Sequence, residues 1–154
     1  MNRPLALGLG AAVLAGAVAL AVSWGSGAPA GTTLMASDPD VVARGEQIYA
    51  ENCAACHGKN LEGQPDWRIP GPDGRLPAPP HDETGHTWHH DGETLFRLTK
   101  YGAGAVIGDP DYASNMPIYE GVLTDEEIIA VLSYIKSTWP QEIRQRHDEM
   151  ENRS

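Results

Sequence analysis

The stretch Cys53-Ala54-Ala55-Cys56-His57 governs how the rest of this sequence is interpreted. A Cys-x-x-Cys-His run is typical of the attachment of c-type haem. Two thiols three positions apart on a helical turn can add to the two vinyl groups of one porphyrin, and His57 can then bind the iron as the proximal ligand. The motif therefore predicts one covalent haem c, held by thioether links from Cys53 and Cys56 and by the His57 imidazole.

Two other uses of these cysteines stay open. A structural zinc ion needs four ligands, and the chain has only two cysteines, so histidines would have to complete the site. The candidates are His81, His86, His89 and His90. A thioredoxin-like dithiol is expected beside a strand, whereas the residues before Cys53 have helical spacing. We therefore favour the haem interpretation.

The composition indicates one small domain with few large apolar side chains. The chain has 154 residues, among them 17 Gly, 12 Pro and a single Phe. A haem is a large, flat and mostly apolar body, so its burial would supply part of the core that the side chains lack. With both cysteines assigned to the porphyrin, no disulfide framework is expected.

The net charge argues against a nucleic-acid partner. The formal charge at pH 7 is −10, and the recognition of a phosphate backbone needs a basic surface. An acidic surface suits redox donors and acceptors that carry a basic docking patch, because opposite charges steer the encounter.

The first 30 residues predict export. They carry one charged side chain, Arg3, and an unbroken run of Leu, Ala, Val and Gly at residues 5–22. Because an Ala-Pro-Ala cleavage signal follows at residues 28–30, residues 1–30 are expected to be a signal peptide. A retained membrane anchor is the alternative, since such a helix spans about 27 Å. Either way the protein would lie in the periplasm, free or tethered to the inner membrane, with residues 31–37 as a flexible tether.

Three helices are predicted, each from a capping residue followed by apolar residues at helical spacing. They run from about residue 39 into the Cys53 turn after Asp38, from about 92 to 100 after Asp91, and from Thr124 to Trp139. The last begins with a capping box, in which Glu127 pairs with Thr124. Gly45 lies inside the first helix at a cost of about 1 kcal/mol against Ala, which indicates that another helix crosses close by.

The remaining segments are predicted to be irregular. Residues 59–80 and 102–119 are rich in proline and glycine, and the charged residues 140–154 are expected to be an extension that forms a short exposed helix or frays. Between the two loops, the run from His81 to Asp91 holds four histidines and three acids. Histidine binds copper and zinc, so this run is a candidate second metal site; the alternative is a solvated loop that binds no metal.

An electron-transfer haem needs a second axial ligand, and Met116 is the best candidate. It is the one methionine in a loop facing a predicted core helix, and Pro117 behind it restricts that loop. A thioether ligand favours ferrous iron and raises the reduction potential. Two alternatives remain. One is a histidine from residues 81–90, and the other is an open sixth position that would suit ligand binding or peroxide chemistry.

In this order, the predicted elements resemble those of the class I mono-haem cytochromes c. The resemblance covers about residues 38–139: the first helix, the haem motif, the Asn115-Met116-Pro117 loop and the last helix. It implies an all-α cytochrome c fold, with three to five helices wrapped around one covalently attached haem and long irregular loops. The domain would then be residues 38–139.

The same resemblance implies two contacts. In that family the first and last helices cross at a glycine and an aromatic residue, which would here be Gly45 and Tyr134. A proline carbonyl also holds the proximal histidine, and either Pro79 or Pro80 could supply it. The histidine-rich run after these prolines departs from the common pattern.

The function that we expect is one-electron transfer in the bacterial periplasm, without catalytic residues of the chain's own. One alternative is a haem c subunit of a membrane oxidase or dehydrogenase complex. Another is a haem protein that also binds copper through its histidine-rich loop. The sequence does not identify the redox partners.

Overall fold

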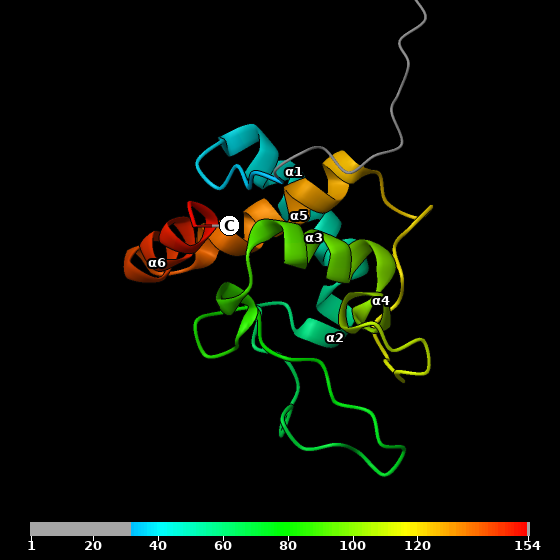
Figure 1. The fold of residues 1–154 in the computed structure, drawn as a ribbon. Coiled ribbons are helices and arrows are strands. Elements are labelled where there is room, and N and C mark those ends of the chain that lie inside the picture. Colours follow the sequence, from blue (N-terminus) through cyan, green and yellow to red (C-terminus); the bar gives the residue numbers. More distant parts are fainter. Residues whose placement is uncertain (1–31, 154) are drawn as a thin grey trace, which may run out of the picture.

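The computed structural model describes residues 32–153, and every regular element in this range is a helix (Figure 1). The elements are α1 (Pro39–Asn52), α2 (Ala54–His57), the 3-10 helix η1 (Thr87–His89), α3 (Gly92–Tyr101), α4 (Ala103–Ile107), α5 (Asp125–Thr138) and α6 (Gln141–Glu151). The all-α prediction is confirmed for this part of the chain. The helices outnumber the expected three to five because α4 forms where we expected a loop, and because the C-terminal extension forms the helix α6, which was one of its two predicted outcomes.

The first helix begins and ends where the sequence predicts. The Asp38 carboxylate accepts hydrogen bonds from the backbone N–H groups of Asp40 and Val41, and Pro39 occupies the first turn. The helix buries Gly45, Ile48 and Tyr49. It ends at Asn52, so the haem motif follows it directly.

Helix α5 is also confirmed. Its capping box is complete: the Thr124 hydroxyl accepts from the Glu127 N–H, and the Glu127 carboxylate accepts from the Thr124 N–H. The helix buries half of its residues, and Ile128, Val131, Leu132 and Ile135 recur at helical spacing on the side that faces the core.

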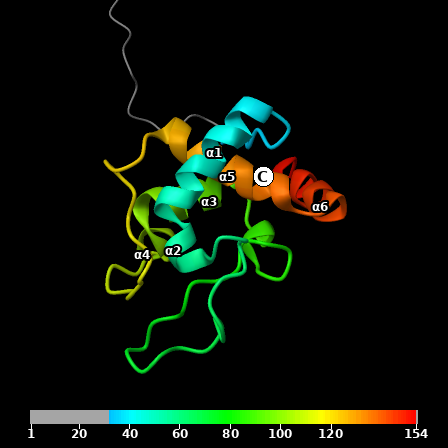
Figure 2. The ribbon, with the colours of Figure 1, turned by 180° about the vertical axis from the view of Figure 1, so that it is seen from behind.

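Helices α1 and α5 cross in close contact (Figures 1 and 2). A methyl group on Gly45 would overlap the backbone carbonyl of Ala130 and would lie 2.8 Å from the Tyr134 Cβ. Only glycine allows this approach, so the predicted pairing of Gly45 with Tyr134 is confirmed. The Tyr49 and Tyr134 rings also pack together, with centroids 5.5 Å apart.

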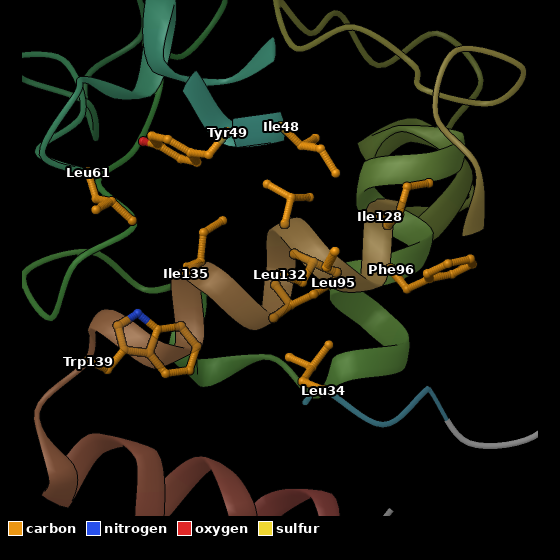
Figure 3. Packing of buried hydrophobic residues seen from close by; sticks show 12 residues of the cluster. Leu34, Ile48, Tyr49, Leu61, Leu95, Phe96, Ile128, Leu132, Ile135 and Trp139 are labelled. Atoms are coloured by element: carbon orange, nitrogen blue, oxygen red, sulfur yellow. The ribbon is translucent and has the colours of Figure 1, made fainter. Parts of the chain in front are cut away.

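One apolar cluster fills the space between α1, α3 and α5 (Figure 3). Its fully buried members include Phe96 and Ile128, and Leu34 and Trp139 close it at its edges. Phe96, the single phenylalanine of the chain, lies on the buried side of α3. Within residues 32–153 the core is small, and 12 buried residues form it as one cluster.

Residues 102–119, expected to be irregular, contain the short helix α4. Gly102 precedes it with a φ of 84°, and Gly108 follows it in the left-handed region with a φ of 74°. Other residues adopt such angles rarely, so the two glycines define the limits of the helix. The rest of this segment and residues 59–80 are irregular, as predicted. The loop after α2 extends away from the helices (Figure 2).

The segment before α1 is not a free tether in the part that the structure describes. Thr32 and Leu34 are buried, and the Met35 N–H donates to the Ser133 hydroxyl at 2.9 Å. The Thr32 hydroxyl donates to Glu93 Oε2 at 2.7 Å. The expectation of a flexible tether at residues 31–37 is therefore wrong for residues 32–37, because they carry a buried leucine and two bonds to the domain.

The C-terminal extension packs on the domain as helix α6. Lys136 forms a 2.6 Å ion pair with Asp148, and Glu151 accepts a 2.6 Å bond from the Gly92 N–H. His147 is fully buried, and its Nε2 donates to the His90 carbonyl at 3.0 Å. The expected domain boundary at residue 140 therefore does not separate two independently packed parts, because α6 contacts the domain that precedes it.

The predicted signal peptide or anchor at residues 1–30 lies outside the described residues. Among residues 32–153, the structure contains no helix with the length and apolarity needed to cross a membrane.

Candidate haem-attachment site

The two cysteines of the motif lie on one turn at the end of α1. The N–H groups of Cys56 and His57 both donate to the Cys53 carbonyl, at 3.1 and 2.9 Å. Cys53 is half-buried and Cys56 is exposed, and neither forms a disulfide. Burial, with a smaller contribution from Cys56, raises the pKa of the Cys53 thiol to about 11. Because neither cysteine forms a disulfide, both thiols are available to add to the vinyl groups of one porphyrin, as the motif predicts.

The His57 imidazole is buried and oriented. Its Nδ1 lies 2.8 Å from the Pro79 carbonyl oxygen, so of the two candidate prolines the structure selects Pro79. Because a carbonyl can only accept, Nδ1 carries the proton and Nε2 keeps a free lone pair. Burial lowers the pKa of His57, against the smaller opposing effect of the Pro79 carbonyl, so the ring stays neutral. A neutral imidazole with a free Nε2 is the form that binds a metal ion.

A second ring lies against this imidazole. The His81 ring stacks on His57 with centroids 4.0 Å apart and an interplanar angle of 19°. The sequence places these residues 24 positions apart and gives no signal of the contact.

The other histidines of the run from His81 to Asp91 do not converge. His86 stacks on Trp67, and His89 stacks on Trp88. Within residues 32–153 no group of three or more His, Cys, Asp or Glu side chains is arranged to hold a metal ion. The His86 and His90 rings do meet edge to face, with centroids 5.3 Å apart, but the described residues bring no third ligand to them. Of the two interpretations of this run, the structure therefore favours the loop that binds no second metal.

Met116 lies in the second loop, 38% exposed, with its N–H bonded to the Ser114 hydroxyl at 3.0 Å. Two contacts hold this loop next to the haem motif. The Tyr119 hydroxyl donates to the Asn52 carbonyl at 2.7 Å, immediately before Cys53. Asn115 accepts a 3.2 Å bond from Arg75, which belongs to the loop that also supplies Pro79. The Met116 loop is therefore bonded to the end of α1, which precedes the motif, and to the loop that follows the motif.

Sequence reasoning missed the tyrosines that hold the motif. The Tyr49 hydroxyl donates to the Gly58 carbonyl at 2.8 Å and so fixes the residue after His57. Burial raises the pKa of Tyr49 and of Tyr119, which keeps both hydroxyls protonated as donors. Helical spacing places Tyr49 on the core side of α1, but no pattern indicates where its hydroxyl points.

The side chains around the motif suit a haem. Most of the large hydrophobic side chains that are exposed in residues 32–153 belong to the two loops beside it. They are Ile69, Leu76, Ile107, Tyr112, Met116 and Ile118. A flat apolar body bound at the cysteines would cover such side chains, whereas in water they have no favourable partner. The site therefore offers two free thiols for covalent attachment, a neutral imidazole for the iron and apolar side chains to cover the porphyrin, which are the groups that a c-type haem requires.

This site and the helical fold define a mono-haem c-type domain. The family model for cytochrome c matches residues 42–139, and the chain belongs to this family. Its cofactor is accordingly a covalent haem c, and its activity is electron transfer.

The chain is also similar to curated oxidase subunits. It is 32% identical over 95 residues to the CcoP subunit of the cbb3-type cytochrome c oxidase of Rhodobacter capsulatus, which covers 60% of this chain and 28% of the relative. It is 32% identical over 100 residues to the CcoP subunit of Azospirillum sp. strain B510, which covers 65% and 29%. The chain thus spans less than a third of the length of these relatives. No solved structure matches it.

Proposed function

We propose that this chain is the haem c domain through which electrons enter or pass along a membrane oxidase of the cbb3 type, facing the periplasm. The observation that carries the proposal is the similarity to CcoP subunits over about two thirds of this chain. Two features of the chain support it. The apolar run at residues 5–22 is long enough for an anchor, and residues 32–37 pack on the domain instead of forming a loose connection.

The roles of the site residues follow from their positions. Cys53 and Cys56 form the thioether links, His57 is the proximal ligand and Met116 is the distal ligand. His57 is supported as a ligand by its free Nε2 and its bond to Pro79. Met116 is supported by the exposure of its side chain in a loop that Tyr119 fastens beside Cys53.

The haem supplies the redox centre when it is attached. The chain's own residues keep that centre ready for outer-sphere transfer. Burial keeps the His57 imidazole neutral and the Pro79 carbonyl orients it, so no proton has to move when the charge of the iron changes. The exposed apolar side chains of the two loops would exclude water from an attached haem, which would keep the reorganisation that accompanies each transfer small.

The role of Met116 is tested by spectroscopy of Met116→Ala, with Met35→Ala as the matched control. Both methionines are partly exposed, at 38% and 43%, but only Met116 lies in the loop beside the motif. Met116→Ala should abolish the weak red absorption band of thioether-bound ferric haem and lower the reduction potential, whereas Met35→Ala should change neither. A Met116→Ala protein that keeps the band would contradict this assignment.

The role in an oxidase is tested by purification. Membranes of cells that produce the tagged chain are extracted with a mild detergent, and the tagged complex is isolated. We expect oxidase subunits to co-purify and the chain's haem to be oxidised by oxygen within the complex. Recovery of the chain as a monomer from the periplasmic fraction, with none in the membrane, would instead favour a free one-electron carrier.

A further inference from the structure

His81 is held by contacts to both its backbone and its ring. Its N–H donates to the Leu61 carbonyl at 2.7 Å, and its own carbonyl accepts a 2.7 Å bond from Trp139 Nε1 at the end of α5. Its ring Nδ1 lies 2.8 Å from the Thr87 hydroxyl oxygen. The edge of the Tyr49 ring approaches from α1, with centroids 6.3 Å apart. Backbone and ring are therefore both fixed.

The fixed ring lies flat on His57. The centroids are 4.0 Å apart and the planes differ by 19°, so the two imidazoles are in face-to-face contact. A ligand imidazole binds iron end-on through Nε2 and leaves its faces free, so this stack does not obstruct the metal. It does oppose rotation of the His57 ring, which the single bond from Nδ1 to Pro79 would otherwise permit.

We propose that His81 is a positioning residue that sets the plane of the His57 imidazole, with Thr87 and Trp139 holding His81 in place. This inference rests on the proposed role of His57 as the proximal ligand. The angle of the ligand plane determines how the imidazole overlaps with the iron orbitals, so His81 tunes the electronic structure of the site without touching the iron. Through Trp139, the end of α5 is connected mechanically to the proximal ligand.

The neighbouring histidines provide matched controls. His86 and His89 are exposed, and their rings stack on Trp67 and Trp88 instead of on His57. Substituting His89 removes an imidazole from the same run of sequence without removing the stack on His57.

The experiment compares His81→Ala, His81→Phe, Thr87→Val and His89→Ala in the haem-loaded protein. One measurement is the pattern of haem methyl shifts in the proton NMR spectrum of the oxidised form, which depends on the plane of the axial imidazole. The other is the reduction potential. His81→Ala should redistribute the methyl shifts and lower the potential, because water that reaches His57 stabilises the ferric charge. His81→Phe should restore most of the wild-type pattern, since a flat ring again covers His57.

Thr87→Val keeps the His81 ring but removes the hydroxyl that orients it, so a smaller shift in the same direction is expected. This variant preserves the test if His81→Ala does not fold. The inference is overturned if His81→Ala or Thr87→Val folds, carries haem and keeps the wild-type shifts, or if His89→Ala changes them as much. A wild-type spectrum without histidine ligation would instead overturn the proposed role of His57, so the two failures are distinguishable.

Discussion

The crossing of α1 with α5 and the pair of loops around the haem motif are built on different principles. At the crossing, Ile48, Ile128 and Val131 are at most 2% exposed and belong to one buried cluster. In the loops, Ile69 and Ile118 are 62% and 56% exposed, although both are large and apolar. One region is closed by its own side chains, and the other presents apolar surface for a partner to cover.

The difference indicates how the stability of the domain is divided. The side chains at the crossing exclude water from one another, so we expect the crossing to hold α1 and α5 together without help from the haem. The loops are fastened by a few hydrogen bonds, among them those of Tyr49, Arg75 and Tyr119. Their apolar side chains gain stability only when the haem covers them, at about 25 cal/mol per Å². The haem should therefore stabilise the loops far more than it stabilises the crossing.

Preventing haem attachment is expected to have the largest effect. The double variant Cys53→Ala, Cys56→Ala should yield colourless protein in which hydrogen exchange is much faster in residues 58–90 and 102–119 than in the wild type. The loss of protection in α1 and α5 should be smaller. Equal loss of protection in both regions would show that the crossing depends on the haem as much as the loops do, and would contradict the proposed division of stability.

The second test acts on the crossing. Gly45→Val places a branched side chain against the Ala130 carbonyl and Tyr134, neither of which can move without separating the helices. We expect a loss of more than about 3 kcal/mol in the free energy of unfolding, at the upper end of overpacking effects. Chemical denaturation of the haem-loaded protein measures it. The control is Ala43→Val, an exposed position on the same helix, where a change of less than about 1 kcal/mol is expected.

Most of the closed region could be predicted from the sequence. Asp38, Asp91 and Thr124 are local signals for the starts of helices, and each one caps the helix that it was expected to cap. Gly45 inside an otherwise regular helix indicated a close crossing, and Tyr134 was its predicted partner. Capping and helical spacing depend on residues within one or two turns, so the sequence alone contains what they need.

The site and the ends of the chain were harder to predict because they depend on contacts across long separations. His81 meets His57, and Trp139 meets His81, through the arrangement of loops that no periodicity describes. Pro79 and not Pro80 accepts the bond from His57 because its carbonyl points at the ring, and the sequence does not indicate that direction. The charged composition of residues 140–151 indicated an exposed segment, whereas the helix is held through polar pairs and a buried His147.

Helix α6 belongs to the closed side of the molecule but should be its pH-sensitive part. His147 is fully buried, its Nε2 is bonded to the His90 carbonyl, and its Nδ1 has no hydrogen-bond partner, although Glu151 Oε1 lies 3.5 Å away. Burial and the nearby Lys136 lower the pKa of His147 to about 4. The other charged groups that face it are Asp91 at the start of α3 and Asp148 on α6.

Because the pKa of His147 is lowered in the folded protein, the free energy of unfolding should fall as the pH falls. The unfolded chain takes up a proton below about pH 6.5, whereas folded His147 stays neutral down to about pH 4, so stability present above pH 6.5 is lost between these values. The loss should be at most about 3 to 4 kcal/mol. His147→Phe should flatten this part of a pH series of denaturation curves. Burial raises the pKa of Glu151, which acts in the opposite direction, so the difference between wild type and variant is the quantity to measure.

The smallest expected effect lies where the two regions meet. Tyr119 joins the Met116 loop to the last residue of α1 through the Asn52 carbonyl, and Tyr119→Phe removes that hydroxyl alone. We expect a loss of about 1 kcal/mol in stability, the usual value for one hydrogen bond. If the bond holds the loop in place, the thioether band of the oxidised protein should also disappear at a lower temperature than in the wild type. Tyr112→Phe is the control, because Tyr112 is exposed on the same loop, and it should change neither quantity. An unchanged melting of the band in Tyr119→Phe would mean that the Tyr119 bond does not hold the Met116 loop, which would then depend on the haem and on the remaining contacts of the loop, such as that of Asn115 with Arg75.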